Sequence, residues 1–292
     1  LRAGSITKLY TATIIMKLKE EGYLSLGDTL DRWFPEIPGA DTITIRYLLN
    51  HTSGIYSYTE NTGFQIKAVL SPQRVWRPGE LYQYILKGKP YFTPGEDHHY
   101  SNSNYLLLGM IAEKVTGDSY EALLHRMVLD EAGLMPTYFL PDEKRLGDLI
   151  MGYDRDVIPL GVHRIGPENN VWASAGYSAG GIAANAADIA GFLKALFTCE
   201  IISRDSLREM TAFGNFTDED IPEQTGYGLG MRRLVVSGDT LIGHTGTIPG
   251  FGGAAFYCPE EDYYIALLGN ISYLEQGEWL AMIVNTVHEI KE

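Results

Sequence analysis

Apolar residues recur at helical spacing through the first two-thirds of the chain. Over residues 5–21 they fall three and four positions apart, which predicts a helix with one buried face, and Gly22 is a suitable stop. The same spacing predicts further helices over 44–50, from Asn102 or Ser103 to about Val115, over 119–132, and over 184–197 behind Asn185 as a cap. Residues 140–180 show few periodic stretches, so a loop is expected there.

The pattern changes near residue 226, where short β-rich runs alternate with turn residues. Neighbouring runs of this kind pair as hairpins, so they predict an antiparallel sheet. The runs are 226–236, 240–246, 252–258 and 263–270. An amphipathic stretch over 273–290 predicts a closing helix. Helices that precede a block of strands indicate an α+β fold, with an antiparallel sheet flanked by helices, rather than alternating βαβ units.

The composition of the 292 residues is that of a packed globular protein, because 45% of them are hydrophobic. The formal charge of −14 argues against nucleic-acid or anionic-membrane partners, and an anionic substrate would need a locally positive pocket. No apolar run approaches the length of a membrane span. Cys199 and Cys258 are the two cysteines, and the sequence leaves open whether they are buried thiols or a disulfide.

The first candidate for chemistry is the Ser5-x-x-Lys8 spacing at the start of the 5–21 helix. Residues three apart share a helical face, so Lys8 can reach the Ser5 hydroxyl. The free N–H groups of the first turn and the helix dipole favour negative charge there. An acyl-transfer nucleophile needs such a base and such donors. A capping serine with a surface lysine is the alternative, since about one such spacing is expected by chance in a chain of this length.

The second candidate is the stretch Tyr100-Ser101-Asn102. A tyrosine phenol has a pKa of about 10, so it is a poor base until a nearby ammonium such as Lys8 favours its anion. It could then take and return a proton. Asn102 carries a donor and an acceptor, so it could hold Lys8 and a substrate amide together. A helix-capping asparagine beside a packed tyrosine is the alternative.

The third candidate is the glycine-rich stretch around His244, Thr245 and Gly246. Thr245 and Gly246 are expected to end a strand, and a glycine beside a cleft lets the backbone approach a ligand closely. An edge strand there would offer N–H and C=O groups to an extended substrate. A glycine-rich turn with an ordinary half-buried histidine is the alternative.

The order Ser-x-x-Lys, Tyr-x-Asn, His-Thr-Gly resembles the serine penicillin-binding protein and class C β-lactamase superfamily. The likeness extends from Ala3 to about Asn270. Similar connecting stretches are RAGSITKLYTA (2–12), IRYLLNHTSGI (45–55), FTPGEDHHYSNSNYLLLGMIAEKVTG (92–117), SAGGIAANAADIAGFL (178–193) and YGLGMRR (227–233). The resemblance implies a β-lactamase/transpeptidase-like fold, with the active site between two lobes. These are an α/β lobe of residues 1–25 and 175–292 and a mostly helical lobe of residues 26–174.

The same resemblance implies roles for the candidate residues. Ser5 is the acylated nucleophile, and Lys8 and Tyr100 form a proton-transfer pair in which either can be the base. The resemblance also implies that Asn102 binds Lys8 and the substrate backbone. The remaining implied residues are His244, Thr245 and Gly246 on the opposite wall, and Thr247, whose N–H completes an oxyanion hole with that of Ser5.

Two positions bear on the branch of the superfamily. Its β-lactamases usually have lysine where this chain has His244, and a histidine of pKa about 6.5 is mostly neutral at pH 7. Arg232 could restore the missing cation, because the matching arginine of the similar secreted D-alanyl-D-alanine carboxypeptidase binds the terminal carboxylate of the substrate. Trp172 falls where that carboxypeptidase has a tryptophan at the cleft. A solvated strand residue is the alternative for Arg232.

The resemblance predicts a serine hydrolase that acts through an acyl-enzyme, foremost a D-Ala-D-Ala carboxypeptidase-like peptidase that binds penicillin. A class C-like β-lactamase, a small-ester carboxylesterase and a D-aminopeptidase or amidase are alternatives, as is a non-catalytic peptide-recognition protein. The expected partners are small peptides, esters or β-lactams, with no cofactor. Adjacent histidines in GEDHH (95–99) make a poor ligand set, so no metal is predicted.

The resemblance also favours an extracytoplasmic location, secreted or periplasmic. In the superfamily, two strands and a helix precede the nucleophile helix, and those strands pair with the C-terminal sheet. Only four residues precede Ser5 here. We therefore expect that LRAGSITK (1–8) is internal to a longer gene product and that the N-terminal strands are missing from this chain.

Overall fold

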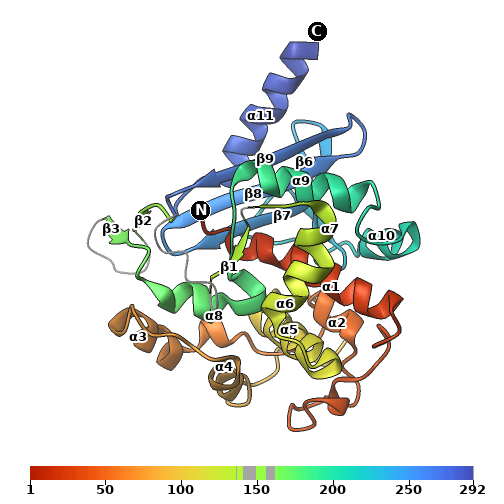
Figure 1. Ribbon diagram of the computed structural model, residues 1–292, viewed down its shortest axis with the longest axis vertical. Coiled ribbons are helices and arrows are strands. Elements are labelled where there is room, and N and C mark those ends of the chain that lie inside the picture. The colour runs from red at the N-terminus through yellow and green to blue at the C-terminus, as the bar shows by residue number, and fades with distance from the viewer. Residues whose placement is uncertain (136, 141–148, 156–161, 292) are drawn as a thin grey trace.

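Five antiparallel strands form the main sheet of the computed structural model, which describes residues 1–135, 137–140, 149–155 and 162–291 (Figure 1). Sequential strands are neighbours, as short hairpins require. In order across the sheet they are β5 (Gln224–Tyr227), β6 (Arg232–Val236), β7 (Asp239–Ile248), β8 (Phe251–Cys258) and β9 (Tyr263–Gly269). The predicted α+β fold with an antiparallel meander is confirmed, although the run 226–236 is divided between two strands.

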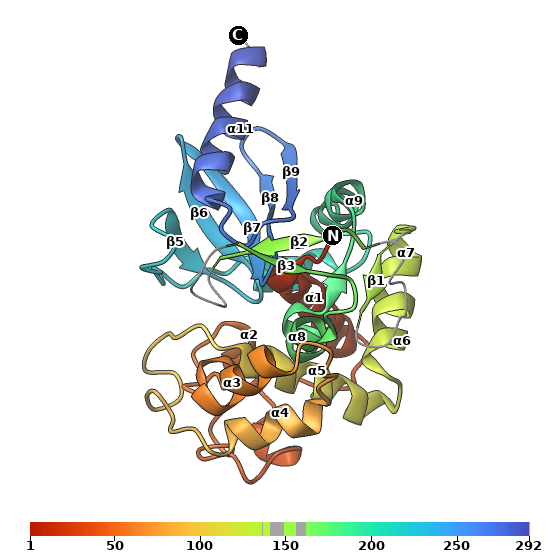
Figure 2. The ribbon, with the colours of Figure 1, turned by 90° about the vertical axis from the view of Figure 1, so that its left-hand side faces the viewer.

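Helices are the other main class of element, and Figure 2 shows α1 and α8 between the sheet and the group α2–α5. The helices are α1 (Thr7–Glu20), α2 (Ile45–Leu49), α3 (Thr62–Leu70), α4 (Pro78–Ile85), α5 (Asn102–Thr116), α6 (Tyr120–Leu124), α7 (Asp130–Ala132), α8 (Asn170–Gly180), α9 (Ala186–Phe197), α10 (Arg204–Met210) and α11 (Gln276–Lys291). Two small antiparallel pairs join β1 (Tyr138–Phe139) to β4 (Ile182–Ala183) and β2 (Gly152–Asp154) to β3 (His163–Ile165).

The sheet is covered on both faces. Phe256 of β8 packs with Leu280 and Val284 of α11. The next residue back, Ala255, belongs to the main core, which also contains the inward residues of α1 and α9. Burial on both faces explains why β8 is a nearly continuous run of apolar and small residues.

Strand β7 differs from the expected edge strand that ends at Gly246. It continues to Ile248 and lies in the middle of the sheet. Its pairing with β6 stops at Gly243, whereas its pairing with β8 runs to Ile248. Residues 244–248 therefore have a strand neighbour on one side only, and the nucleophile turn, η1 (Gly4–Ile6), packs against this strand.

The loop expected over 140–180 is wrong at its end, where α8 forms. Its sequence NVWASAGYSAG is rich in small residues, which pack closely against α1 and α5 without leaving a periodic apolar stripe. Residues 141–148 and 156–161 of the expected loop lie outside the described residues. Helix α1 is likewise buried on every side from Thr7 to Leu18 rather than on one face.

The start of α5 also corrects an expectation. Ser101 occupies the N-cap position, so neither Asn102 nor Ser103 is the cap. Asn102 is instead the first helical residue, which leaves its side chain available for other contacts. The predicted division into lobes at residues 25 and 175 stays a prediction.

Candidate active site

The candidate nucleophile lies in a tight turn packed on β7. Ser5 is half-buried in η1, and Gly4 before it has φ +54°, a conformation that favours glycine. A Cβ added to Gly4 would lie 3.0 Å from the backbone of Thr247, and one added to Gly246 would lie 2.1 Å from the Ala3 carbonyl oxygen. Glycine at both positions therefore lets the Ser5 turn lie directly against the strand that carries Thr247.

Lys8 lies one helical turn after Ser5 and is fully buried. Its Nζ lies 3.0 Å from Ser5 Oγ, 2.8 Å from Asn102 Oδ1 and 2.9 Å from the carbonyl oxygen of Ala179. Burial, followed by the nearby Arg232 charge, holds the pKa of Lys8 well below its usual 10.5. The structure thus brings Ser5, Lys8 and Asn102 into one hydrogen-bonded group.

Tyr100 lies beside this group. Its ring centroid is 4.9 Å from Lys8 Nζ and 5.0 Å from Arg232 Cζ. The hydroxyl is buried and has no hydrogen bond of standard geometry within the described residues, although Ser5 and Arg232 are near enough to lower its pKa. Burial outweighs both and raises the pKa of Tyr100 to about 12.

Asn102 is oriented by the segment that precedes α3. Its Nδ2 lies 3.2 Å from Thr59 Oγ1, and its backbone N–H donates to Ser57 Oγ, also at 3.2 Å. The amide nitrogen is thus directed to Thr59, and Oδ1 is left to accept from Lys8. Ser57 and Thr59 are positioning residues that the sequence patterns did not reveal.

His244 and Thr245 lie on the β7 side of the site. His244 is fully buried, with its ring centroid 6.0 Å from that of Tyr100 and its Nε2 3.0 Å from the hydroxyl of Tyr227. Its Nδ1 contacts the carbonyl oxygen of Thr245. Burial, Arg232 and Lys8 hold the pKa of His244 well below its usual 6.5. The half-buried histidine that the sequence left as an alternative is thus fully buried, and its lowered pKa agrees with the mostly neutral ring expected at pH 7.

Arg232 lies at the cleft as expected, but its charge is already paired. Its Nη1 lies 2.9 Å from Asp218 Oδ2 and also donates to Gln224 Oε1. Only 5% of the Arg232 side chain is exposed, against 20% of that of Asp218. Sequence reasoning missed Asp218, which stands in a turn-rich acidic run that is typical of a solvated loop. The paired and buried guanidinium is no longer a free cation for a substrate carboxylate.

An apolar cavity of about 440 Å³ opens beside Ser5. Its mouth includes Asn102 and Thr247, so it begins at the proposed reacting groups. Trp172 lines it, as the sequence suggested for a residue at the cleft. The other apolar side chains of the lining are Tyr58, Phe64, Val69, Ala175, Ala179, Ile248 and Pro249.

A larger cleft of about 1020 Å³ meets the same residues from the other side, where Tyr100, Arg232, His244 and Thr245 form part of its wall. Carboxylates dominate the remainder of this wall. They belong to Glu60, Asp218, Glu219, Asp220, Glu223, Glu275 and Glu278. The cleft beside Ser5 is therefore acidic, in line with the net charge of the chain.

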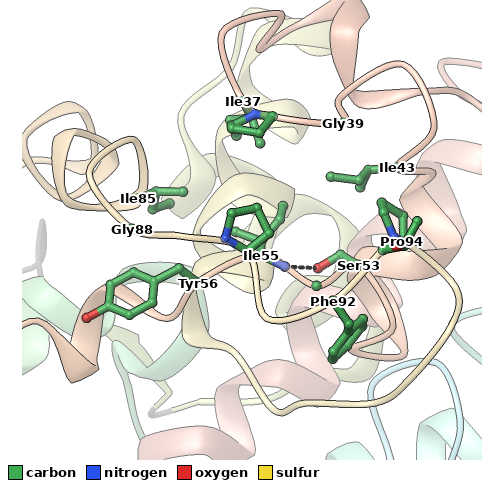
Figure 3. A pocket seen from close by; sticks show the side chains of 14 residues that line it. Ile37, Gly39, Ile43, Ser53, Ile55, Tyr56, Ile85, Gly88, Phe92 and Pro94 are labelled. Atoms are coloured by element: carbon green, nitrogen blue, oxygen red, sulfur yellow. Dashed lines mark hydrogen bonds between the residues drawn. The ribbon is translucent and has the colours of Figure 1, made fainter.

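A third cavity, of about 300 Å³, lies apart from the nucleophile and is shown in Figure 3. Apolar side chains and prolines line most of it, with Ser53 and Ile55 on one wall. Within the part of the chain that the structure describes, no cluster of three or more histidine, cysteine or acidic residues could hold a metal ion. Both cysteines are free thiols, and no described helix is long and apolar enough to cross a membrane.

Comparison with known proteins gives consistent results. A family profile described as Beta-lactamase matches residues 1–282. The Bacillus subtilis protein "Putative penicillin-binding protein PbpX" is 26% identical over 287 residues, which cover 98% of this chain and 65% of that protein. The chain thus spans less than two thirds of the length of this relative.

Two solved structures share the fold over nearly the whole chain. A D-stereospecific amidohydrolase from Streptomyces sp. is 31% identical with a TM-score of 0.87, over 97% of this chain and 85% of that one. The D-amino acid amidase from Ochrobactrum anthropi SV3, complexed with D-phenylalanine, is 25% identical with a TM-score of 0.80, over 93% and 85% of the two chains.

Proposed function

The chain belongs to the beta-lactamase family, and from this premise we propose that it is a serine hydrolase that cleaves amides or esters of D-amino acids with a free ammonium group. The reaction runs through an acyl-enzyme on Ser5. One observation supports this above all: the buried Lys8 Nζ lies 3.0 Å from Ser5 Oγ, where it can act as a base once it is neutral.

A neutral lysine amine has two N–H donors and one lone pair. Asn102 Oδ1 and the Ala179 carbonyl can only accept, so they take the two N–H groups. The lone pair is then left for the Ser5 hydroxyl, whose oxygen lies 3.0 Å away. Burial and Arg232 favour this neutral form, because both lower the pKa of Lys8. Lys8 is therefore the proposed base for Ser5.

The rest of the reaction follows from this assignment. The Ser5 proton passes to Lys8, Oγ attacks the carbonyl carbon, and the N–H groups of Ser5 and Thr247 stabilise the oxyanion. Tyr100, kept protonated by its raised pKa, gives its proton to the leaving nitrogen or oxygen and recovers one from Lys8. The bond between the carbonyl carbon and the leaving group breaks. Water then attacks the carbonyl carbon of the ester and its proton passes to Lys8. The bond from that carbon to Ser5 Oγ breaks, and Lys8 returns the proton to Oγ, which leaves Ser5 as a hydroxyl.

The two cavities beside Ser5 support the substrate class. The apolar cavity suits an aliphatic or aromatic side chain on the acyl residue, and the acidic cleft attracts an ammonium group. The names of the two similar structures describe a D-stereospecific amidohydrolase and a D-amino acid amidase. These names support amide hydrolysis at a D-amino acid, and the charge of the cleft supports a free amino group on it.

A carboxypeptidase that removes a terminal D-alanine is the second candidate. Arg232 favours it, because its guanidinium lies on the cleft wall and could bind a carboxylate. Its pairing with Asp218 and Gln224 disfavours it, since a substrate carboxylate would have to displace or share those partners. The seven carboxylates of the same cleft also repel an anionic substrate.

Matched substrates test the proposal directly. D-phenylalanine methyl ester and its N-acetyl derivative differ only in the ammonium group, and the enzyme should prefer the free amine by about tenfold or more in kcat/KM. N-acyl-D-alanyl-D-alanine and a cephalosporin complete the panel. Equal rates on the ester pair, or a preference for the dipeptide, would reject the ammonium substrate. A fluorophosphonate adduct that persists in Ser5→Ala would reject the nucleophile.

The Asp218 pair gives a variant with a matched control. Asp218→Asn frees Arg232, so hydrolysis of the free-amine ester should fall and that of the acylated dipeptide should rise, each by about tenfold. Asp205→Asn removes the same charge from α10, outside the cleft lining, and should leave both rates unchanged. Equal effects of the two variants would show that general charge, not the Arg232 pair, governs the preference.

A further inference from the structure

A buried histidine with an unusual backbone lies behind the site. His51 has φ 61°, in the left-handed region that non-glycine residues rarely occupy, and its side chain is fully buried. Its Nδ1 receives the backbone N–H of Ser101 at 3.2 Å and the side-chain Nδ2 of Asn104 at 3.0 Å. Because a backbone N–H can only donate, Nδ1 is the acceptor, and the ring proton of His51 is on Nε2.

This tautomer sets the direction of the next hydrogen bonds. His51 Nε2 lies 3.2 Å from the hydroxyl of Tyr227, which must therefore accept there. The same hydroxyl lies 3.0 Å from Nε2 of His244. The Nδ1 of His244 faces the carbonyl oxygen of Thr245, which can only accept, so the ring proton of His244 is on Nδ1. Its Nε2 is then an acceptor, and Tyr227 donates to it.

The chain of hydrogen bonds also extends from His51 away from His244, with the same donor-to-acceptor direction. Asn104 donates from Nδ2 to His51, so its Oδ1 accepts from Ser53 Oγ at 2.6 Å. Ser53 Oγ in turn accepts from the backbone N–H of Ile55 at 3.1 Å, which Figure 3 shows as a dashed line at the wall of the third cavity. All donors from Ile55 to His244 thus point the same way.

We propose that Ser53, Asn104, His51 and Tyr227 are positioning residues, and that their directed chain fixes the spacing between the two walls of the catalytic site. Asn104 in this series belongs to α5, whose first residue Asn102 contacts Lys8. One end is the Thr245 carbonyl on β7, two residues before Thr247. The chain therefore connects the wall that holds the proposed base to the strand that carries the proposed oxyanion hole.

The chain also occupies both nitrogens of His244 and so excludes it as a base in the resting enzyme. Lys8, Arg232, Tyr100 and Tyr227 face His244, and burial, followed by the Arg232 charge, disfavours a protonated His244. His51 is kept neutral in the same way, because burial, followed by the charges of His98, Lys8, His244 and Arg232, disfavours its charged form. A hydroxyl that donates to Nε2 keeps His244 neutral without an added charge.

Tyr227→Phe removes the central hydroxyl and keeps the ring. On the substrate preferred by the wild type, kcat should fall about 10- to 100-fold with little change in KM, because the walls lose register while the substrate pockets remain. The acid limb of the kcat profile should move to higher pH, since His244 can then be protonated. Tyr120→Phe deletes another buried hydroxyl, which contacts Thr11 at 2.6 Å, and should retain wild-type kcat.

A second measurement needs no substrate and no variant activity. Long-range ¹H–¹⁵N correlation spectra of the labelled wild type should show His51 protonated only on Nε2 and His244 only on Nδ1 at neutral pH. Signals are assigned by their loss in His51→Gln and His244→Gln. The opposite tautomer or a doubly protonated ring at either position would overturn the chain. Equal losses of kcat in Tyr227→Phe and Tyr120→Phe, or none in either, would overturn its positioning role.

These results test the chain of hydrogen bonds separately from the proposed function, on which its catalytic role rests. If the wild type hydrolyses none of the substrates and Ser5 forms no adduct, the hydrolase proposal fails. The histidine tautomers still decide in that case whether the chain of hydrogen bonds exists. If Ser5 reacts but the two tyrosine variants behave alike, the hydrolase proposal stands and the positioning role fails.

Discussion

Replacing Gly246 by alanine tests whether the site depends on close contact between the Ser5 turn and β7. The added Cβ would lie 2.1 Å from the Ala3 carbonyl oxygen and 3.1 Å from the Ile6 side chain. The first distance must grow by about 0.9 Å to reach 3.0 Å, below which real Cβ contacts are essentially absent. The obstacle is backbone, so the turn and the strand must separate.

That separation displaces the N–H of Thr247 from that of Ser5. A misplacement near 1 Å in a catalytic group costs about 100-fold in rate, and the crowding costs about 1–3 kcal/mol of stability. We therefore expect Gly246→Ala to acylate Ser5 about 100-fold more slowly while KM changes little, because both substrate pockets keep their linings.

The assay is the rate of Ser5 labelling by a fluorophosphonate, followed by intact mass, alongside ester hydrolysis. Gly79→Ala is the matched control, because its Cβ meets nothing within 4 Å and its φ is not positive. Urea unfolding of both variants shows that each is folded under the assay conditions. Labelling of Gly246→Ala at the wild-type rate would refute the close-contact argument and with it the proposed pairing of the two N–H groups.

Two further predictions concern pH and the apolar cavity. The rate of Ser5 acylation should rise with pH at a midpoint well below 10.5, as Lys8 loses its proton. Arg232→Gln should move that midpoint upward, because removing the cation raises the pKa of Lys8. An unchanged or lower midpoint in the variant, measured over about pH 5–10, would contradict Lys8 as the base. Val69→Trp fills part of the apolar cavity, so kcat/KM for the D-phenylalanine ester should fall about tenfold more than kcat/KM for the D-alanine ester. Equal losses on both esters would show that the acyl side chain does not enter this cavity.

The parts of the fold that the sequence predicted are those with a strong repeat. The β-rich runs after residue 226 and the 184–197 helix correspond to structure because their apolar residues are buried in the two cores on either face of the sheet. Helices α3, α4 and α10 were not predicted, since they are short and their signals are broken by polar residues. Helix α8 was missed because small residues bury without a periodic stripe, and because Tyr177 inside it has φ 40°.

The site was predictable where order in the sequence corresponds to proximity in space. Ser5, Lys8 and Asn102 form one hydrogen-bonded group, and their two motifs could be found without a structure. The pairing of Arg232 could not be predicted, because Asp218 is fourteen residues away in a loop whose acidic residues look solvated. His51 stands in the quoted stretch IRYLLNHTSGI, but nothing local shows which atoms its ring will meet.

The charges of the site explain why one motif set can serve substrates of opposite sign. Burial lowers the pKa of Lys8, and Arg232 adds to that effect from inside the cleft wall. An exposed arginine would also attract carboxylates, whereas Asp218 pairs Arg232 on the cleft side and leaves its field on Lys8. In the proposed mechanism the base is thus set by residues of the motifs and β6, while the loop of Asp218 sets the preferred charge of the substrate. Substitutions in that loop should alter selectivity before they alter the chemistry at Ser5.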